Sequence, residues 1–555
     1  MLWVAGGAVP RQASCARPKT EIVERPTSFA LRRTELRQLE KIAWKPGRGC
    51  GQVENSQIRD ILVSSNAAGR RATAVLRKSR VERALAMNIR SSFSSGTNLD
   101  NFATSGALRF RARAAIPGGA HTYAKGDDQY PLLAPGFIAR GLGCHVWDVD
   151  GNEFIEYGMG LRAVSLGHGF PAVVKAAVGQ MSQGTNFTRP SALEVECAER
   201  LIELVPAAEM AKFTKDGSTA TTAAIRLARA YTGRDMIALC SDQPFFSYDD
   251  WAICTTPMNA GVPRAMAELT QGFRYNDLSS AEALFARYPG RVAALILEAE
   301  KEVPPTPGYL AKLRKLCHRN GALLIIDEMI TGFRWPGCSA QRHHGIEADL
   351  STFGKAMGNG IAISALLGRR EIMELGGLNH DRDRVFLLST THGAETHALA
   401  AALAVMNTYR DEPVIETLHR QGSRLKAGIE NSTQRRGLTR YFKLAGRTSN
   451  MVYACCDRDG VPSQTFRTLF LQETIRRGLL APSLVTSYSH TNDDIDRTIE
   501  AIDGALAVYQ KALEDGPEAH LIGRPVAPVF RRRATSTSAG TPRTKVRGSR
   551  DAKAS

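Results

Sequence analysis

Two side chains of this sequence have the types and spacing for amine chemistry. Asp327 ends the apolar run 322–327, and Lys355 follows 28 residues later in the glycine-rich segment 351–360. A lysine beside glycines is open to a bulky planar partner, because the backbone there carries no obstructing side chains. Its amine could form a Schiff base, while a carboxylate at a strand end could hold a protonated pyridine nitrogen. Taken alone, Asp327 is more simply interpreted as a turn or cap residue and Lys355 as a solvated lysine.

A third element upstream strengthens this interpretation. The segment 215–219 precedes a predicted helix over 221–231. Gly217 and Ser218 can therefore aim free backbone N–H groups, reinforced by the helix dipole, at a phosphate. Together the three elements predict a site for a phosphorylated ring that reacts with an amine.

Alternating strands and helices must position these residues. Short, continuous apolar runs are typical of strands covered on both faces, and they occur at 236–240, 292–299, 322–327 and 362–368. Helical stretches at 221–231 and 308–319 lie between them. The pattern predicts an α/β fold with a large, mostly parallel sheet. Upstream, the alternating residues 144–149, Asp150-Gly151 and 154–157 predict a β-hairpin.

Changes in composition predict five segments along the chain. We expect a poorly ordered basic extension (1–100), an N-terminal segment of the small domain (101–165), a large cofactor-binding domain (166–400), a small α+β C-terminal domain (401–514) and a disordered basic tail (515–555). Neither end holds a motif residue. Residues 101–515 are therefore expected to suffice for folding and cofactor binding.

The net charge of +17 belongs to the two ends. Lys and Arg exceed Asp and Glu by 10 in residues 1–100 and by 8 in 524–555, which leaves a centre of charge −1. A basic total would suggest nucleic acid or a membrane surface, but the neutral centre shows no such bias, so solvated extensions are favoured. No apolar run reaches the roughly 18 residues of a membrane span. We expect neither a specific nucleic acid nor a membrane as a partner.

Cysteine and histidine usage bears on compartment and metals. The ten cysteines include no CxxC pair, which is typical of a reduced, cytoplasmic protein. The first twenty residues hold three bases and no acid, so an organellar transit peptide stays an alternative. We expect no metal site, because the histidines are not spaced from acidic residues as metal ligands are. The histidines considered are His168, His343, His344 and His392.

Five segments of the chain carry a family resemblance. They read WDVDGNEFIEY, SLGHGFPAVVKA, GSTATTAAIRLARAYTGRD, LIIDEMITGFR and DLSTFGKAMGNG. In this order they resemble the class III aminotransferases of pyridoxal phosphate fold type I, and most of all the glutamate-1-semialdehyde 2,1-aminomutases. The resemblance covers residues 105–512. It implies a fold type I transferase that uses pyridoxal phosphate to move an amino group of a small substrate.

The resemblance also assigns roles to residues. It implies that Lys355 is the Schiff-base lysine, that Asp327 partners the pyridine nitrogen, and that Gly217 and Ser218 form the phosphate cup. It further implies a homodimer in which a threonine of the neighbouring subunit meets the phosphate. Thr391 matches best, with Thr390 as the alternative.

Departures from the family lie around the cofactor. Phe245 aligns with the ring that stacks on the cofactor and needs no hydroxyl for this, while Phe246 is equally well a core residue. Asp216 and Thr219 replace residues that are usually Ser or Asn and Glu or Asp. Asp216 would repel a phosphate unless its carboxylate points away.

The substrate side departs further. The family's Ser-Pro-Val-Arg segment supplies a carboxylate-binding arginine, but 117–125 contains none. Lys125 there offers a charge without a bidentate fork, and His121 fits a structural role better. The segment 481–496 is shorter than its counterpart and lacks a glutamate. The match of the fold motifs favours an aminomutase, whereas the missing arginine favours the alternative, an aminotransferase that acts on another substrate, an oxo sugar or oxo acid.

A third hypothesis belongs to another class of protein. The chain could be a non-catalytic relative that binds a partner through its basic ends. The unusual Asp216 favours this hypothesis, whereas retention of Lys355 and Asp327 opposes it.

Overall fold

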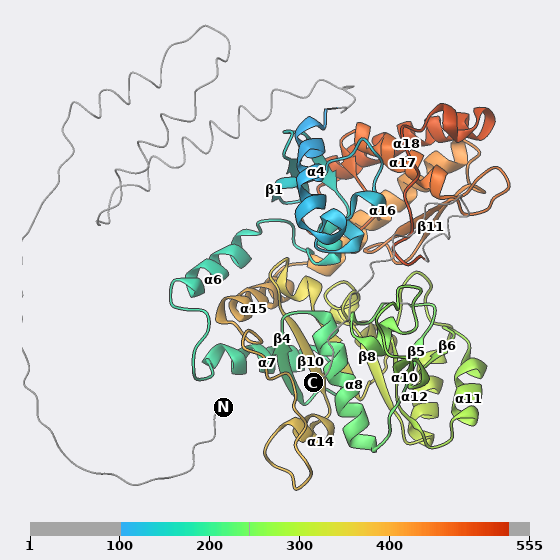
Figure 1. Ribbon diagram of the computed structural model, residues 1–555. Helices are drawn as coiled ribbons and strands as arrows, with labels where there is room; N and C mark the ends of the chain where they lie inside the picture. The colour runs from blue at the N-terminus through green and yellow to red at the C-terminus, as the bar shows by residue number, and fades with distance from the viewer. Residues whose placement is uncertain (1–100, 244, 532–555) are drawn as a thin grey trace, which may run out of the picture. The chain divides into compact units, whose positions relative to one another are not determined.

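The computed structural model of the protein describes residues 101–243 and 245–531 (Figure 1). The predicted extension 1–100 and the end of the predicted tail lie outside these residues. No helix in the described ranges combines the length and apolarity needed to cross a membrane. The eight cysteines that the structure describes are all free thiols.

A seven-stranded sheet in the order β4-β10-β9-β8-β7-β5-β6 forms the centre of the large domain. Strands β5 to β9 run parallel, and β10 is antiparallel to both of its neighbours. The predicted mostly parallel sheet is therefore confirmed. The strands are β4 (Met210–Thr214), β5 (Met236–Cys240), β6 (Thr270–Phe273), β7 (Val292–Leu297), β8 (Leu323–Asp327), β9 (Leu350–Phe353) and β10 (Ser364–Gly368).

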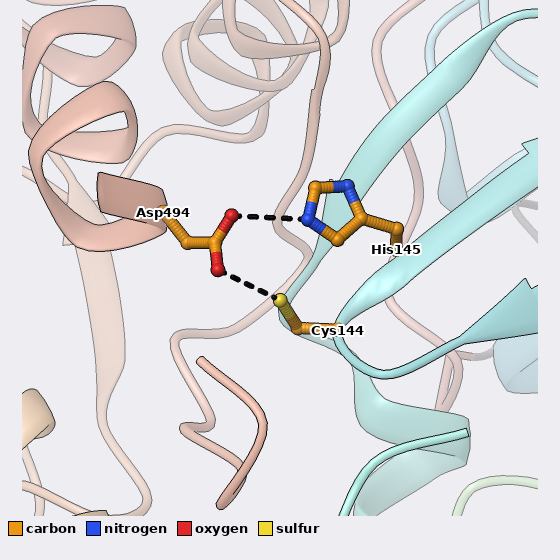
Figure 2. A group of neighbouring side chains, drawn as sticks. All are labelled: Cys144, His145 and Asp494. Carbon is orange, nitrogen blue, oxygen red and sulfur yellow. Dashed lines mark hydrogen bonds and ion pairs between the residues drawn. The ribbon is translucent and has the colours of Figure 1, made fainter. Parts of the chain in front are cut away.

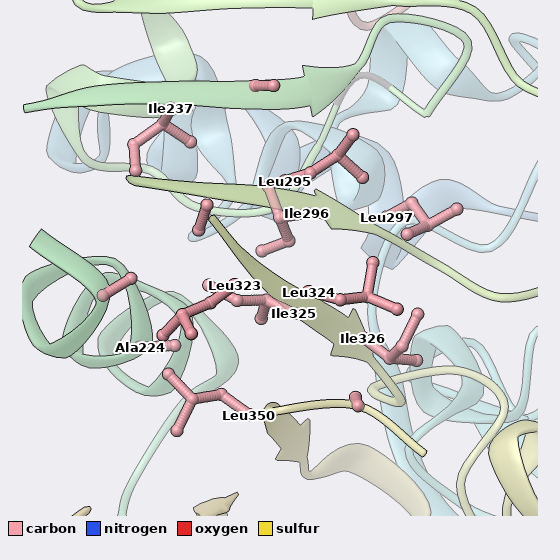
Figure 3. Packing of buried hydrophobic residues seen from close by; sticks show 14 of the residues in the cluster. Ala224, Ile237, Leu295, Ile296, Leu297, Leu323, Leu324, Ile325, Ile326 and Leu350 are labelled. Atoms are coloured by element: carbon pink, nitrogen blue, oxygen red, sulfur yellow. The ribbon is translucent and has the colours of Figure 1, made fainter. Parts of the chain in front are cut away.

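The middle strands are apolar on both faces, as Figure 3 shows for β7 and β8. Leu295, Ile296 and Ile325 are completely buried. Such side chains stabilise the fold by about 1.5–3 kcal/mol each when removed from water. The register pairs Asp327 of β8 with Thr352 of β9, so both strands end at one edge of the sheet. Ligands of open α/β sheets bind at this carboxyl edge.

Helices pack on the sheet and on one another. Helix α8 lies along β10, β9, β8, β7 and β4, and α12 packs on β8, while α15 contacts both α6 and α7. Their bounds are α6 (Pro171–Met181), α7 (Ala192–Leu204), α8 (Gly217–Thr232), α12 (Tyr309–Arg319) and α15 (Thr396–Asp411). Further helices of this domain are α9 (Asp250–Ile253), α10 (Arg264–Glu268), α11 (Leu278–Arg287), α13 (Ala340–His344) and α14 (Arg370–Met373).

The smaller α+β part draws on both ends of the described chain. One sheet has the order β1-β2-β3-β13, and a second pairs β11 with β12. Strands β2 and β3 form the predicted hairpin, whose turn places Gly151 at φ +89°. The strands are β1 (Ile138–Leu142), β2 (His145–Asp148), β3 (Glu153–Glu156), β11 (Phe442–Ala445), β12 (Val452–Cys455) and β13 (Leu479–Leu480). The helices are α4 (Ala103–Ala115), α5 (Met159–Arg162), α16 (Val414–Arg435), α17 (Gln464–Arg476) and α18 (Asn492–Asp515).

Residues 516–531, which we call the C-terminal strap, differ from the predicted disordered tail. Val526 is 4% exposed, and its N–H donates to Thr468 Oγ1 at 2.8 Å. Gln129 Nε2 donates to the carbonyl of Ala527 at 2.8 Å. The prediction of disorder is wrong for the strap, because partners distant in sequence satisfy its backbone and bury its valine.

A charged cluster joins β2 to the start of α18 (Figure 2). Asp494 accepts from His145 Nε2 at 3.0 Å and from Cys144 Sγ at 3.4 Å. On the other side of the ring, His145 Nδ1 lies 2.9 Å from Glu153 Oε1. Burial alone would lower the pKa of His145, but bonds to Asp494, Cys144 and Glu153 outweigh it and raise this pKa. These bonds link the hairpin to the start of α18.

Candidate active site

Asp327 presents one free carboxylate oxygen at the carboxyl edge of the sheet. The residue is 4% exposed, and its Oδ1 accepts from the N–H of Met329 at 2.8 Å and from Thr352 Oγ1 at 3.1 Å. No described residue donates to Oδ2. Burial raises the pKa of Asp327, against the opposing effect of the nearby Lys355 charge. The carboxylate is thus fixed in place with one oxygen left for a ligand.

Lys355 follows β9 in a constrained loop. Its φ is +47°, an unfavourable conformation for a side-chain-bearing residue and one that is common at functional sites. A Cβ on Gly354 would lie 2.4 Å from Ser364 Oγ, so the preceding position requires glycine. Within the described residues, no hydrogen bond or ion pair engages the Lys355 amine.

Electrostatics favour the neutral form of this amine. Burial lowers the pKa of Lys355, and the charges of Arg162 and Lys301 lower it further, while Asp327 and Glu298 oppose them. A lowered pKa increases the fraction of free amine, which is the nucleophilic form.

Gly217 and Ser218, the predicted phosphate cup, begin helix α8. The N-cap residue Asp216 accepts from the N–H of Thr219 through Oδ1 and from its hydroxyl through Oδ2, both at 2.9 Å. The two unusual residues of this loop therefore bind each other. The N–H groups of Gly217 and Ser218 have no acceptor among the described residues and remain available to an anion.

Met329 brings the three elements together, although the sequence analysis did not single it out. Its N–H holds Asp327, and its Sδ lies 2.8 Å from the position of a Cβ on Gly217 and 2.7 Å from one on Gly354. The phosphate loop, the carboxylate and the lysine loop thus meet at one side chain. Met329 stands in the motif LIIDEMITGFR, but no spacing rule marks its role.

The aromatic loop places its two candidate rings differently. Phe246 is 3% exposed within the core of the large domain, whereas Phe245 is 53% exposed. The N–H of Tyr248 donates to Ser218 Oγ at 3.1 Å, which ties this loop to the start of α8. Of the two rings, only Phe245 is free to contact a ligand there. Its nearest aromatic neighbour is Phe530 of the strap, with ring centroids 6.4 Å apart.

Thr390 and Thr391 lie exposed on an anchored loop. The carbonyl of Thr391 accepts from Asn186 Nδ2 at 3.0 Å. Glu395 at the end of the loop forms an ion pair with Lys215, next to the phosphate loop. The threonine hydroxyls make no hydrogen bond to a described residue and are accessible to a neighbouring subunit.

A buried acid adjoins the lysine. Glu298 follows β7, and burial raises its pKa to about 7. Lys301 Nζ lies 3.9 Å from Glu298 Oε1, while Oε2 is buried without a hydrogen-bond partner in the described structure. Sequence reasoning missed Glu298 because a strand-end glutamate carries no distinctive signal.

The segment that lacks the family's arginine lines a separate cavity of about 470 Å³. His121 and Lys125 contribute to its wall together with Gly158, Gly160 and Leu161. Neither Lys355 nor Asp327 lines this cavity.

Comparison with known proteins identifies the family. The class III aminotransferase family matches residues 123–446. The chain belongs to the class III aminotransferases. The glutamate-1-semialdehyde 2,1-aminomutase of Desulforamulus reducens is 33% identical over 423 residues, which are 72% of this chain and 97% of the relative. Its counterpart from Acetivibrio thermocellus is 34% identical over 414 residues, covering 71% and 95%.

Solved structures agree with this assignment. The FumI protein of Sphingopyxis sp. MTA144, determined with pyridoxal phosphate, is 30% identical, with TM-score 0.68 over 76% of this chain and 98% of that one. An omega-transaminase from Sphaerobacter thermophilus is 25% identical, with TM-score 0.66 over 76% and 99%. The predicted fold type I enzyme that depends on pyridoxal phosphate is therefore confirmed.

The residues of this site fit that cofactor. The unpartnered Lys355 amine suits the aldehyde of the cofactor, and the free Asp327 oxygen suits its ring nitrogen. The two N–H groups at the start of α8 suit its phosphate. Gly217 and Gly354 pack so closely on Met329 that side chains there would displace it.

Proposed function

We propose that the protein transfers an amino group through pyridoxal phosphate bound covalently by Lys355. The observation that carries the proposal is the amine of the half-buried Lys355, which has no hydrogen-bond or ion-pair partner among the described residues and interacts electrostatically with Asp327. The bound cofactor supplies an electron sink for charge that develops on the substrate carbon. Asp327 Oδ2 would hold its ring nitrogen, Gly217 and Ser218 its phosphate, and Phe245 its ring face.

Lys355 then moves the proton. With the cofactor and substrate bound, the Lys355 amine would act as the base that takes the proton from the substrate carbon and would then give that proton back as an acid. The lowered pKa of Lys355 supports this role, because the amine must be unprotonated to act as a base.

The relatives support two versions of the reaction. Those at 33–34% identity are named glutamate-1-semialdehyde 2,1-aminomutases, so the first version transfers the amine within one such molecule. The absence of arginine from 117–125 supports the second, in which a different oxo substrate, an oxo sugar or oxo acid, receives the amine. A non-catalytic binding role receives no support from the site, since each element that the cofactor needs is present.

We infer that the functional unit is a homodimer in the cytoplasm. Val174, Val178 and Met181 are 45%, 59% and 53% exposed, and their spacing places them on one face of α6. An apolar face of this kind suits burial against a second copy, which would bring the exposed Thr391 to the neighbouring phosphate. The free thiols of the described residues fit a reducing compartment.

Covalent mapping of the cofactor tests the central claim. We expect the protein to gain a visible absorption band with pyridoxal phosphate, and borohydride to fix the label on Lys355. Lys355→Ala should abolish the band and turnover, whereas Lys312→Ala, which removes an exposed amine from α12, should change neither. A label on another lysine would overturn the assignment.

A further inference from the structure

A strained turn in the small domain carries an arginine toward the lysine loop. Four consecutive residues have left-handed backbones, with φ +42° at Met159, +58° at Gly160, +59° at Leu161 and +71° at Arg162. Only one is a glycine, so the surrounding structure must impose this conformation. Such strain is found preferentially where a side chain is held for a ligand.

Two buried side chains hold the turn. Arg334 Nη2 donates to the carbonyls of Arg162 at 3.0 Å and Val164 at 3.1 Å. Asn359 Oδ1 accepts from the N–H groups of the next two residues, Ser165 and Leu166, at 2.9 Å each. Because Asn359 belongs to the loop of Lys355, these bonds fasten the arginine-bearing segment to the reaction centre.

The Arg162 side chain is held at one end and free at the other. Its Nε donates to Asn450 Oδ1 at 2.7 Å, and Asn450 itself is buried. In the described parts of the chain, no carboxylate forms an ion pair with Arg162 and no acceptor bonds its terminal nitrogens. Burial lowers the pKa of Arg162, and the more distant charges of Glu298 and Glu302 oppose this. An arginine guanidinium stays protonated in proteins, so half-buried Arg162 offers a charge and an open pair of donors.

We propose that Arg162 binds the acidic group of the substrate, a carboxylate or a phosphate. Two parallel N–H donors match either group bidentately, which a lysine cannot do. The inference rests on the proposed amino transfer, since it places the acidic group beside the Lys355 loop. It also accounts for the lack of arginine in 117–125, because Arg162 supplies the charge from another segment.

Acid binding provides a test that is independent of turnover. Calorimetric titration of the cofactor-loaded protein would use glutarate, propylphosphonate and, as a neutral analogue, 1,5-pentanediol. We expect Arg162→Gln to weaken binding of an acid roughly 10- to 100-fold, the range for losing a charge-assisted pair. Arg424→Gln, which removes an exposed arginine paired with Asp496, is the matched control and should bind as wild type.

The outcomes separate the possibilities. Preference for glutarate assigns a carboxylate, and preference for propylphosphonate a phosphate; either supports the proposal. The proposal is overturned if Arg162→Gln and Arg424→Gln weaken acid binding equally, or if Arg162→Gln leaves acid binding unchanged. It is also overturned if the wild-type protein binds no acid. If Arg162→Gln does not fold, Asn450→Asp keeps the arginine but adds a competing carboxylate, and should weaken acid binding at least about threefold. Unchanged acid binding in Asn450→Asp would likewise overturn the proposal.

Kinetics distinguish this inference from the proposed function. Conversion of the bound cofactor to its amine form is compared for 5-aminopentanoate and pentylamine, which differ in the acidic group. Equal kcat/KM values would overturn the role of Arg162 while leaving amino transfer intact. No conversion with any amine would overturn amino transfer, and the titration would still decide whether Arg162 binds acids.

Discussion

Replacement of Asp327 by asparagine isolates the charge at the proposed ring-nitrogen site. The amide keeps nearly the same shape, and its oxygen can still accept from the N–H of Met329 and from Thr352 Oγ1. The group that replaces Oδ2 carries no negative charge. We therefore expect the fold and the bound cofactor to persist while the ring nitrogen loses its anionic partner.

The size of the effect follows from Coulomb's law. Two unit charges 4 Å apart interact by about 4 kcal/mol at an effective dielectric constant of 20. At 1.36 kcal/mol per pKa unit, Asp327→Asn should lower the pKa of the ring nitrogen by about three units. If protonation of that nitrogen is needed for the electron sink, turnover should fall by about three orders of magnitude.

The decisive assay uses a cofactor methylated at the ring nitrogen, which carries a permanent positive charge. It should restore a large part of the activity of Asp327→Asn. Asp349→Asn is a control, because Asp349 is a buried acid bonded to Arg369 and His318, so its loss should reduce stability without rescue. Near-normal turnover of Asp327→Asn with the ordinary cofactor, or failure of the methylated one, would refute the role.

Three further predictions concern stability and assembly. Burial lowers the pKa of His490 from its ordinary 6.5 to about 4, so between these pH values the unfolded state binds a proton that the folded state excludes. The free energy of unfolding should therefore fall by up to about 3 kcal/mol as the pH falls through this window. Urea unfolding of His490→Asn should show a smaller loss of stability over the same pH range. Thr391→Val should weaken cofactor retention about tenfold on dilution, with Thr390→Val as control, as measured by dialysis. Trimming residues 101–531 to 101–515 should cost at least about 2 kcal/mol in urea unfolding, from Val526 alone; equal stability of the two chains would restore the prediction that residues 101–515 suffice.

The strands could be predicted because burial on both faces leaves a direct mark on the sequence. The run 236–240 coincides with β5, and 322–327 differs from β8 by one residue. The reversed direction of β10 could not be predicted, since a continuous apolar run is the same in either direction. Helix α8 begins at Gly217 rather than 221 because Asp216 caps it, and a cap depends on one side-chain bond rather than on periodicity.

Residues whose roles depend on distant partners were harder to find. Lys355 and Asp327 were singled out in the sequence by their types, their spacing and the family resemblance, and their roles stay predictions. Met329 has no such signal, since its role comes from packing between Gly217 and Gly354. The strap was misjudged for the same reason, because composition does not show that Thr468 and Gln129 satisfy its backbone.

The departures from the family gain meaning from these distant contacts. Taken singly, Asp216 is a charge that repels phosphate, and the arginine-free segment 117–125 has lost a substrate contact. In the structure the Asp216 carboxylate caps α8 through Thr219, so the N–H groups of Gly217 and Ser218 still face an anion. The strained turn likewise offers Arg162 from a different strand connection. A change at one position can therefore be offset at another, which favours an altered substrate over a lost activity.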